Sequence, residues 1–297
     1  MSQLLTLSAG QAQLRLAPAI GGSIADWHVR NKAGGDTPVM RPIQPGALAQ
    51  NNPRGLASYP LVPLSNRVAN RRFSFAGLSY DLPDLLNGQF IHGAGWMLPW
   101  MVADSGPSHA TLRLDWPGGD LWPFAFSAEQ HFTLAEDGLR HDLSVRNTAE
   151  HPVPVALGAH PFFPRTPQSR LYFAAQHVWL QDDHRISTRR VEIPAHWDHR
   201  HGMAIGRVTL DHCFATWNGM ARIVWPEHAL ALSIAADPIF RHAIVYIPEG
   251  RDFFAFEPVS NMTDGINRID GATDHGMAIL RPDEEIAGTI RFSLEPT

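Results

Sequence analysis

Apolar and polar residues alternate along several stretches of the chain with a period of two. Between residues 126 and 134, Phe126, Phe132 and Leu134 share one parity, and the turn-like sequence Glu-Asp-Gly follows at 136–138. The alternation then resumes, with apolar residues at most odd-numbered positions from 139 to 145. Successive side chains of a strand point to opposite faces, so this pattern predicts a β-hairpin with one face toward a core.

The same alternation recurs at residues 110–116, 230–234 and 290–294, in both halves of the chain. The 24 prolines and 24 glycines are scattered over the whole length and leave few segments long enough for helices. We therefore expect an all-β fold, a large antiparallel β-sandwich. The polar stretch 181–207 is predicted to be a long loop outside the core.

Composition narrows the class of protein. With 297 residues, 44% of them hydrophobic, the chain can bury a substantial core, and we expect one domain over residues 1–297. A formal net charge of −5 lacks the basic footprint that nucleic acids or anionic membranes require. Cys213 is the single cysteine, which excludes an intrachain disulfide and a four-thiolate metal site. No secretory signal or membrane-spanning run is evident, so the sequence predicts a cytoplasmic protein without membrane or nucleic-acid partners.

Two titratable residues lie where burial is expected. Glu257 interrupts the apolar run FFAF at 253–256 and precedes a proline, and His160 is the one titratable group in the segment ALGAHPFF at 156–163. A partly desolvated carboxylate can act as a general base, and an imidazole can exchange protons near neutrality. The alternatives are a structural ion pair for Glu257 and a satisfied core histidine for His160.

Other polar residues lie in segments that suggest the rim of a pocket. Asn66 and Arg67 offer donors and an acceptor for hydroxyl groups, and His92 precedes the turn Gly-Ala-Gly at 93–95. Trp96 could stack on the C–H face of a sugar ring, although a tryptophan in a large sandwich is more often part of the core. A surface position is the simpler interpretation for Arg67 alone.

Together these segments resemble the aldose 1-epimerase (mutarotase) family over nearly the whole chain. The stretch 61–67, LVPLSNR, followed by Phe73 and Gly77, is similar to the family's Asn-Arg element, and His92 with Gly93 is similar to its His-Gly element. The Leu-Asp-x-x-Phe pattern at 210–214, Phe-Glu-Pro at 256–258 and the segment 259–267 also resemble the family. Order and spacing carry this resemblance, since no single motif is specific.

The resemblance implies a galactose mutarotase-like supersandwich that interconverts the α and β anomers of a free aldose. His160 would be the catalytic acid and Glu257 the catalytic base, while Asn66, Arg67, His92, Asp211 and Trp96 would bind the sugar. Arg71, in a second Asn-Arg pair, is the alternative to Arg67. No cofactor or metal is expected, the partner would be a small-molecule sugar, and the protein would be a monomer or homodimer.

Four other functions stay open at this stage. A hexose-6-phosphate 1-epimerase would use arginines such as Arg54, Arg71 or Arg72 for the phosphate. A non-catalytic protein could keep the sugar pocket, and a glycosidase could pair Asp211 with Glu257. A metal site could instead form from the histidines at 196, 199 and 201, although a solvated loop is the preferred interpretation there.

Overall fold

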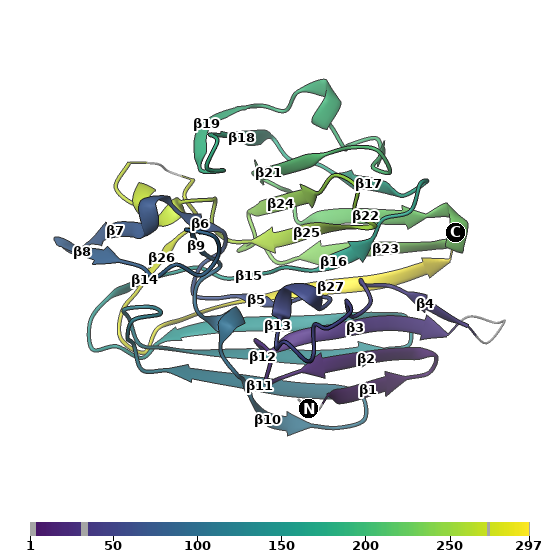
Figure 1. The fold of residues 1–297 in the computed structure, drawn as a ribbon, viewed down its shortest axis with the longest axis horizontal. Coiled ribbons are helices and arrows are strands. Elements are labelled where there is room, and N and C mark those ends of the chain that lie inside the picture. The colour runs from purple at the N-terminus through teal and green to yellow at the C-terminus, as the bar shows by residue number, and fades with distance from the viewer. Residues whose placement is uncertain (1–3, 31–34, 272–273, 297) are drawn as a thin grey trace.

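Antiparallel strands dominate the computed structural model, which describes residues 4–30, 35–271 and 274–296 (Figure 1). The helices of these residues are short 3-10 turns, and none is long and apolar enough to cross a membrane. They are η1 (Pro53–Gly55), η2 (Ala69–Arg71), η3 (Gly95–Met97), η4 (Ala195–Trp197), η5 (Pro226–His228) and η6 (Gly265–Arg268).

A nine-stranded sheet forms one layer of the molecule. Its strands, in spatial order, are β10 (Met101–Ser105), β11 (His109–Trp116), β12 (Phe126–Ala135), β13 (Gly138–Asn147), β27 (Glu285–Pro296), β23 (Leu230–Ala236), β22 (Met220–Trp225), β17 (Arg170–Phe173) and β20 (Met203–Ala204). The predicted hairpin is confirmed, since β12 and β13 pair without interruption from Phe126 opposite Asn147 to Ala135 opposite Gly138.

Two further sheets cover the nine-stranded sheet. One has the order β1 (Leu5–Ala9), β2 (Ala12–Ala17), β3 (Ser23–Arg30) and β4 (Asp36–Pro38). The other has eight strands: β19 (Ser187–Glu192), β18 (His177–Gln181), β21 (Leu210–Ala215), β24 (His242–Ile247), β25 (Phe253–Val259), β15 (Gly158–Ala159) and β5 (Pro60–Leu61), with β16 (Phe162–Pro164) also on β25. Three two-stranded pairs complete the fold: β14 (Val153–Val155) with β26 (Ala278–Leu280), β6 (Arg67–Val68) with β9 (Phe90–Ile91), and β7 (Arg72–Phe75) with β8 (Leu78–Asp81).

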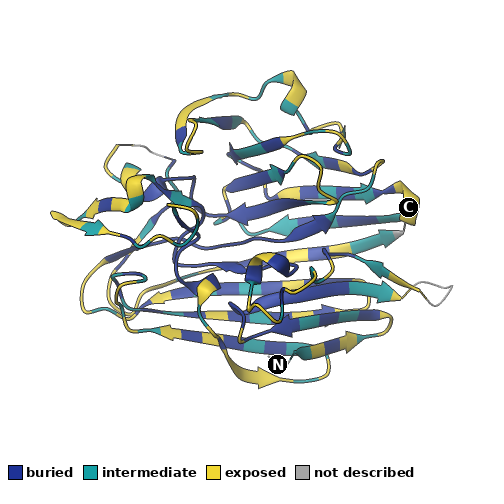
Figure 2. Cartoon of the chain, in the orientation of Figure 1, coloured by how far each residue is buried: buried dark blue, intermediate teal, exposed yellow. Residues whose placement is uncertain are grey.

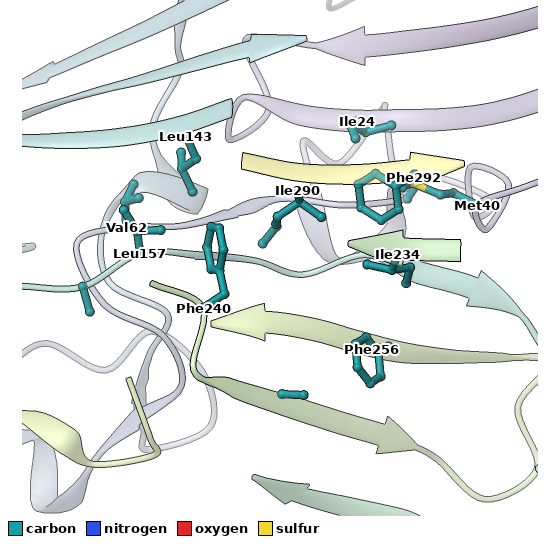
Figure 3. Close-up of a cluster of buried hydrophobic side chains, with 14 of the residues drawn as sticks. Ile24, Met40, Val62, Leu143, Leu157, Ile234, Phe240, Phe256, Ile290 and Phe292 are labelled. Carbon is teal, nitrogen blue, oxygen red and sulfur yellow. The ribbon is translucent and has the colours of Figure 1, made fainter. Parts of the chain in front are cut away.

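The main core lies between these layers. Phe292 of β27 contacts Trp27 of β3 edge-on, with ring centroids 6.2 Å apart, and lies 6.5 Å from Phe163 of β16. One strand of the large sheet therefore packs against both covering sheets. Figure 3 shows Phe292 in this core together with apolar side chains such as Met40 and Ile290. Figure 2 shows burial concentrated in the central strands and exposure at edges such as β10. The predicted all-β sandwich is confirmed.

The prediction of a long loop over residues 181–207 is wrong in part. Residues 187–192 form β19 on the edge of the eight-stranded sheet, and β20 adds a short strand to the nine-stranded sheet. Strand β19 carries exposed polar residues along most of its length, so no alternation signals it. Charged side chains are common on edge strands because they discourage pairing with other chains.

Candidate active site

Strand β25 places Glu257 on the opposite face from the main core. Phe254 and Phe256 point into that core, whereas Ala255 and Val259 belong to a second apolar cluster on the other side of the sheet. The period of two puts Glu257 on this second side. The residue is only 2% exposed, so the carboxyl group is desolvated.

Strand pairing brings His160 to this carboxyl group from a distant part of the sequence. His160 follows β15, which pairs with both β25 and β5, and its backbone N–H donates to the carbonyl of Tyr59 (3.0 Å). The imidazole Nε2 lies 3.1 Å from Oε1 of Glu257. The rings of Tyr59 and Phe162 flank the imidazole, with centroids 4.6 and 4.4 Å away. His160 and Glu257 thus form one close acid-base pair inside an aromatic enclosure.

Burial shifts the pKa values of His160 and Glu257 in opposite directions. Desolvation, helped by the negative charge of Asp211, raises the pKa of Glu257 well above its ordinary value. Desolvation, helped by the positive charge of Arg41, lowers the pKa of His160 to about 3. Burial disfavours the charged form of each group, so the carboxylate becomes a stronger base and the imidazolium a stronger acid. Both shifts favour the uncharged state of the pair, a neutral imidazole beside a protonated carboxyl group.

The short β6–β9 pair aligns Asn66, Arg67 and His92. Arg67 is opposite Ile91, and the next residue, His92, donates its backbone N–H to the carbonyl of Asn66 (2.9 Å). The backbone N–H of Asn66 in turn donates to Nδ1 of His92 (3.2 Å). A ring nitrogen that accepts carries no proton, so the neutral imidazole presents its N–H at Nε2. Burial and the nearby His160 keep the pKa of His92 well below its ordinary value, and the ring therefore stays neutral.

Gly93 allows the chain to turn tightly beside His92. Its φ of +67° lies in the left-handed region, and a Cβ at this position would lie 2.5 Å from the carbonyl oxygen of Val62. A side chain there would therefore force the backbone apart. The glycine that follows His92 in the sequence is thus required by close backbone packing.

Asp211 reaches the same face of the eight-stranded sheet from β21. Its register partner is Tyr246 on β24, the strand that also pairs Ile244 with Glu257. Nη1 of Arg185 donates to Oδ2 of Asp211 (2.6 Å). Residues two apart on β24 therefore place the two carboxylates on one face of the sheet.

These side chains surround a cavity of about 410 Å³. Of the seven residues predicted for the site, the cavity wall includes six: Asn66, Arg67, His92, His160, Asp211 and Glu257. Ordinary sites for small ligands have volumes of roughly 300–1,000 Å³, so the cavity suits one monosaccharide.

The seventh predicted residue, Trp96, lies behind the cavity wall. It is 3% exposed, and its indole N–H donates to the carbonyls of Ile91 and Gly93 (3.1 Å each). Its ring contacts those of Tyr59 and His92, with centroids 5.5 and 6.1 Å away. Trp96 therefore supports two wall residues and is not part of the lining of this cavity.

The three arginines considered for a phosphate site, Arg54, Arg71 and Arg72, differ in whether they line the cavity. Arg54 lines the cavity, whereas Arg71 lies in a neighbouring hollow with Arg67 between the two. Arg72 forms an exposed ion pair with Asp81 (2.6 Å). Of these three, only Arg54 is available to a ligand in the cavity. Of the arginines in the two Asn-Arg pairs, Arg67 lines the cavity and Arg71 does not.

The histidines at 196, 199 and 201 form no metal centre in the residues that the structure describes, where no three His, Cys, Asp or Glu side chains are arranged to hold an ion. The expectation of a solvated loop is wrong for His199. Its ring is 2% exposed and stacks on Phe173, with centroids 4.8 Å apart. Nδ1 lies 3.3 Å from the carbonyl of Leu171, and burial lowers the pKa of His199 to about 4.

Sequence reasoning missed the residues that support the site. Oδ1 of Asn261 accepts from the backbone N–H of Ser65 (2.9 Å), and its Nδ2 donates back to the Ser65 carbonyl (3.0 Å). Oδ1 of Asp264 accepts from the N–H of Ala69 (2.9 Å). These bonds span more than 190 residues along the chain and hold the Asn66–Arg67 segment beside β25. The resemblance of residues 259–267 to the family was the one signal of their importance.

The model of the family described as aldose 1-epimerase matches residues 3–293. The chain belongs to the aldose 1-epimerase family. The resemblance predicted from the motifs is thereby confirmed, and an epimerase-type enzyme is the class of function that this family supports.

Relatives cover the chain from end to end. The uncharacterized protein YphB of Escherichia coli K12 is 26% identical over 98% of this chain and 99% of its own length. A crystal structure of a putative aldose 1-epimerase from E. coli K12 covers 99% of both chains with a TM-score of 0.87 and 27% identity. A GalM/aldose epimerase homologue from C. elegans shares the fold over the full length of both chains, at 16% identity and a TM-score of 0.84.

Proposed function

We propose that this aldose 1-epimerase family member interconverts the α and β anomers of a free aldose. The observation that carries the proposal is the 3.1 Å contact between Nε2 of His160 and Oε1 of Glu257 in a cavity of about 410 Å³. In a pyranose, O1 and the ring oxygen O5 are both bonded to C1. A base for one and an acid for the other must therefore lie next to each other, as this pair does.

In the proposed reaction, the pair reacts from its ionised form, in which the carboxyl proton of Glu257 has moved to Nε2 of His160. Glu257 removes the proton from O1 while His160 donates its proton to O5. The C1–O5 bond breaks and C1 becomes an aldehyde carbon, so the protons balance. Rotation about C1–C2 presents the other face of the aldehyde, and the two groups exchange roles when the ring closes. Each group typically supplies about 10²- to 10⁴-fold in rate.

The other wall residues would hold the sugar hydroxyls. Neutral His92 offers an Nε2–H donor, Arg67 a planar guanidinium, and Asp211 a carboxylate acceptor. Nε of Arg67 donates to Gln89 (2.8 Å) and Nη1 to Oδ1 of Asn66 (3.1 Å), which fixes the fork before a ligand arrives. Such preorganisation reduces the entropic cost of orienting the substrate.

The expectations on cofactors, partners, location and oligomeric state remain those drawn from the sequence. The proposed steps use side chains alone, and the partner is a small-molecule sugar. A cytoplasmic location and a monomeric or homodimeric state stay predictions.

Polarimetry tests the proposal directly. Purified protein should accelerate the mutarotation of freshly dissolved aldoses above the spontaneous rate, and His160→Ala should nearly abolish this activity. An anomer-exchange NMR panel over neutral and phosphorylated aldoses then reads out the substrate. Full mutarotation by the His160→Ala variant would rule out the assigned acid, and sugar binding without any acceleration would favour a non-catalytic binding protein.

A further inference from the structure

The cavity wall contains a buried cation without a counter-ion. Arg41 is 3% exposed, yet it forms no ion pair with any residue in the described ranges. Asp252 acts on it only through longer-range attraction. Burial lowers the pKa of Arg41 to about 10, so the group is still charged at neutrality. Buried charges in proteins are normally paired, because removing an ion from water is costly.

The contacts of Arg41 satisfy only part of its hydrogen-bonding capacity. Nη2 donates to the carbonyls of Arg54 (2.6 Å) and Leu56, whereas the buried Nε has no partner in the described residues. The guanidinium carbon lies 3.7 Å from the centroid of Phe162 and 4.5 Å from that of Phe253. Stacking on aromatic faces attracts a cation weakly, but it supplies no compensating negative charge.

Arg41 lies on the His160 side of the catalytic pair. Phe162 contacts the guanidinium on one side and the ring of His160 on the other, the ring centroids of Phe162 and His160 being 4.4 Å apart. Arg54, whose carbonyl accepts from Arg41, lines the same cavity from the rim. Its exposed guanidinium has no hydrogen bond or ion pair among the described residues.

The cations on the Glu257 side are already engaged. Arg185 is paired with Asp211 at 2.6 Å, and Arg67 donates to Gln89. The charges therefore divide across the cavity: Arg41 and Arg54, which form no ion pair among the described residues, lie near His160, whereas Arg185 and Arg67 share the Glu257 side with the carboxyl groups of Asp211 and Glu257. The acidic Asp183 also lines the cavity and shares the 182–186 turn with Arg185.

We propose that the cavity selects aldoses that carry an anionic group, a carboxylate or a phosphate, on C6. This inference rests on the proposed function, because it uses the placement of O5 at His160 and of O1 at Glu257. C5 is bonded to O5 and carries C6, so the C6 substituent extends on the His160 side of the ring. Arg41 supplies the field there, and Arg54 supplies a fork of free donors that matches a carboxylate or phosphate.

Anomer-exchange NMR on three sugars tests the inference: glucose, glucuronate and glucose 6-phosphate. We expect kcat/KM for at least one anionic sugar to exceed that for glucose by about tenfold or more, and to fall as salt is added, because salt screens the attraction. Arg54→Gln should lower the anionic kcat/KM by about tenfold and that for glucose by a clearly smaller factor, because the C6 hydroxyl of glucose carries no charge. Arg41 also donates to the carbonyls of Arg54 and Leu56, so its substitution could disturb the fold. Arg54 is therefore the residue to substitute.

Arg72→Gln is the matched control, since Arg72 is an exposed arginine paired with Asp81 outside the cavity. This variant should behave as the wild type on all three sugars. Equal or better use of glucose, or an Arg54→Gln effect of the same size on glucose and the anions, would overturn the inference while the epimerase proposal stands. Absence of anomer exchange for all three sugars would instead remove the proposed function itself. The glucuronate and phosphate arms show which anion is preferred.

Discussion

The two faces of strand β25 do opposite things in this protein. On one face, Phe254 and Phe256 are fully buried in the main core, where removal of apolar surface from water stabilises the fold. On the other face, Glu257 is equally hidden, but its Oε2 has no hydrogen-bond partner among the described residues. Leaving a buried polar group unpaired costs stability. One strand thus combines a stabilising face with a costly face that is chemically poised.

The difference shows how the fold holds buried polar groups that lower its stability. The carboxyl group and its partner His160 are fixed by backbone pairing of β15 and β25, and rings such as Phe162 enclose them. The core face carries the stability that permits this, because core phenylalanines each contribute several kcal/mol. Substitutions on the two faces should therefore separate activity from stability.

Glu257→Gln should have the largest effect on activity. We expect mutarotation to fall by about 10²- to 10⁴-fold, because the amide cannot accept the O1 proton. Polarimetry at equal protein concentration measures the loss. A rate within about threefold of the wild type would show that Glu257 is not the base.

The same variant should be as stable as the wild type or more stable. Burial raises the pKa of Glu257, so the fold favours the protonated carboxyl group and loses stability as pH rises through that raised pKa. Glutamine stays neutral at every pH, so the gain should grow toward alkaline pH, to on the order of 1 kcal/mol. Urea unfolding at several pH values tests this, and a clear loss of stability would contradict the account.

Phe256→Ala, one residue away, should show the reverse. Truncating a buried phenylalanine leaves a cavity and should lower the free energy of unfolding by about 3–5 kcal/mol. The folded fraction should keep most of its activity, since the Glu257 side chain is on the other face. Denaturant unfolding with activity measured on the folded protein checks both parts. A rate loss matching that of Glu257→Gln would mean that the faces are not separable.

Asp211→Asn should have an intermediate effect on catalysis. Losing a charged hydrogen-bond acceptor for a hydroxyl should lower kcat/KM by about ten- to a hundredfold. Asp115→Asn is a suitable control, because Asp115 is half exposed, pairs with Arg113 and is not part of the cavity lining. Steady-state kinetics on both variants should separate them, and equal behaviour would remove Asp211 from the binding site.

The smallest effect is expected from pH. Burial lowers the pKa of His160 to about 3, so its imidazole takes up no further proton between pH 7 and pH 5. Activity should therefore change by less than about threefold between about pH 7 and pH 5, where an exposed histidine of pKa about 6.5 would titrate. The profile of kcat/KM at constant ionic strength is the readout. A steep fall centred near the ordinary imidazole pKa would contradict the enclosed pair.

The sequence predicts this molecule well where the signal is local. The alternation around residues 126–145 identifies a real hairpin, and a glutamate that interrupts an apolar run does lie buried. Contacts between distant strands have no local signature, so the meeting of His160 with Glu257 is predicted only through the family resemblance.

The local sequence pattern also does not predict how deeply a side chain lies in the folded protein. Trp96 has the chemistry to stack on a sugar, but it lies one layer behind Tyr59. Arg41, between Met40 and Pro42, carries no sign of the burial that makes it unusual. The edge strand β19 was missed because its exposed polar residues do not alternate with apolar ones.

The central claim is that His160 and Glu257 act as one unit, and a double-mutant cycle of anomer-exchange rates tests it most directly. Residues that act as a unit are strongly non-additive, so the account predicts that His160→Ala combined with Glu257→Gln is no slower than the slower single variant. Losses that multiply across the two sites, or a single variant that keeps the wild-type rate, would contradict it.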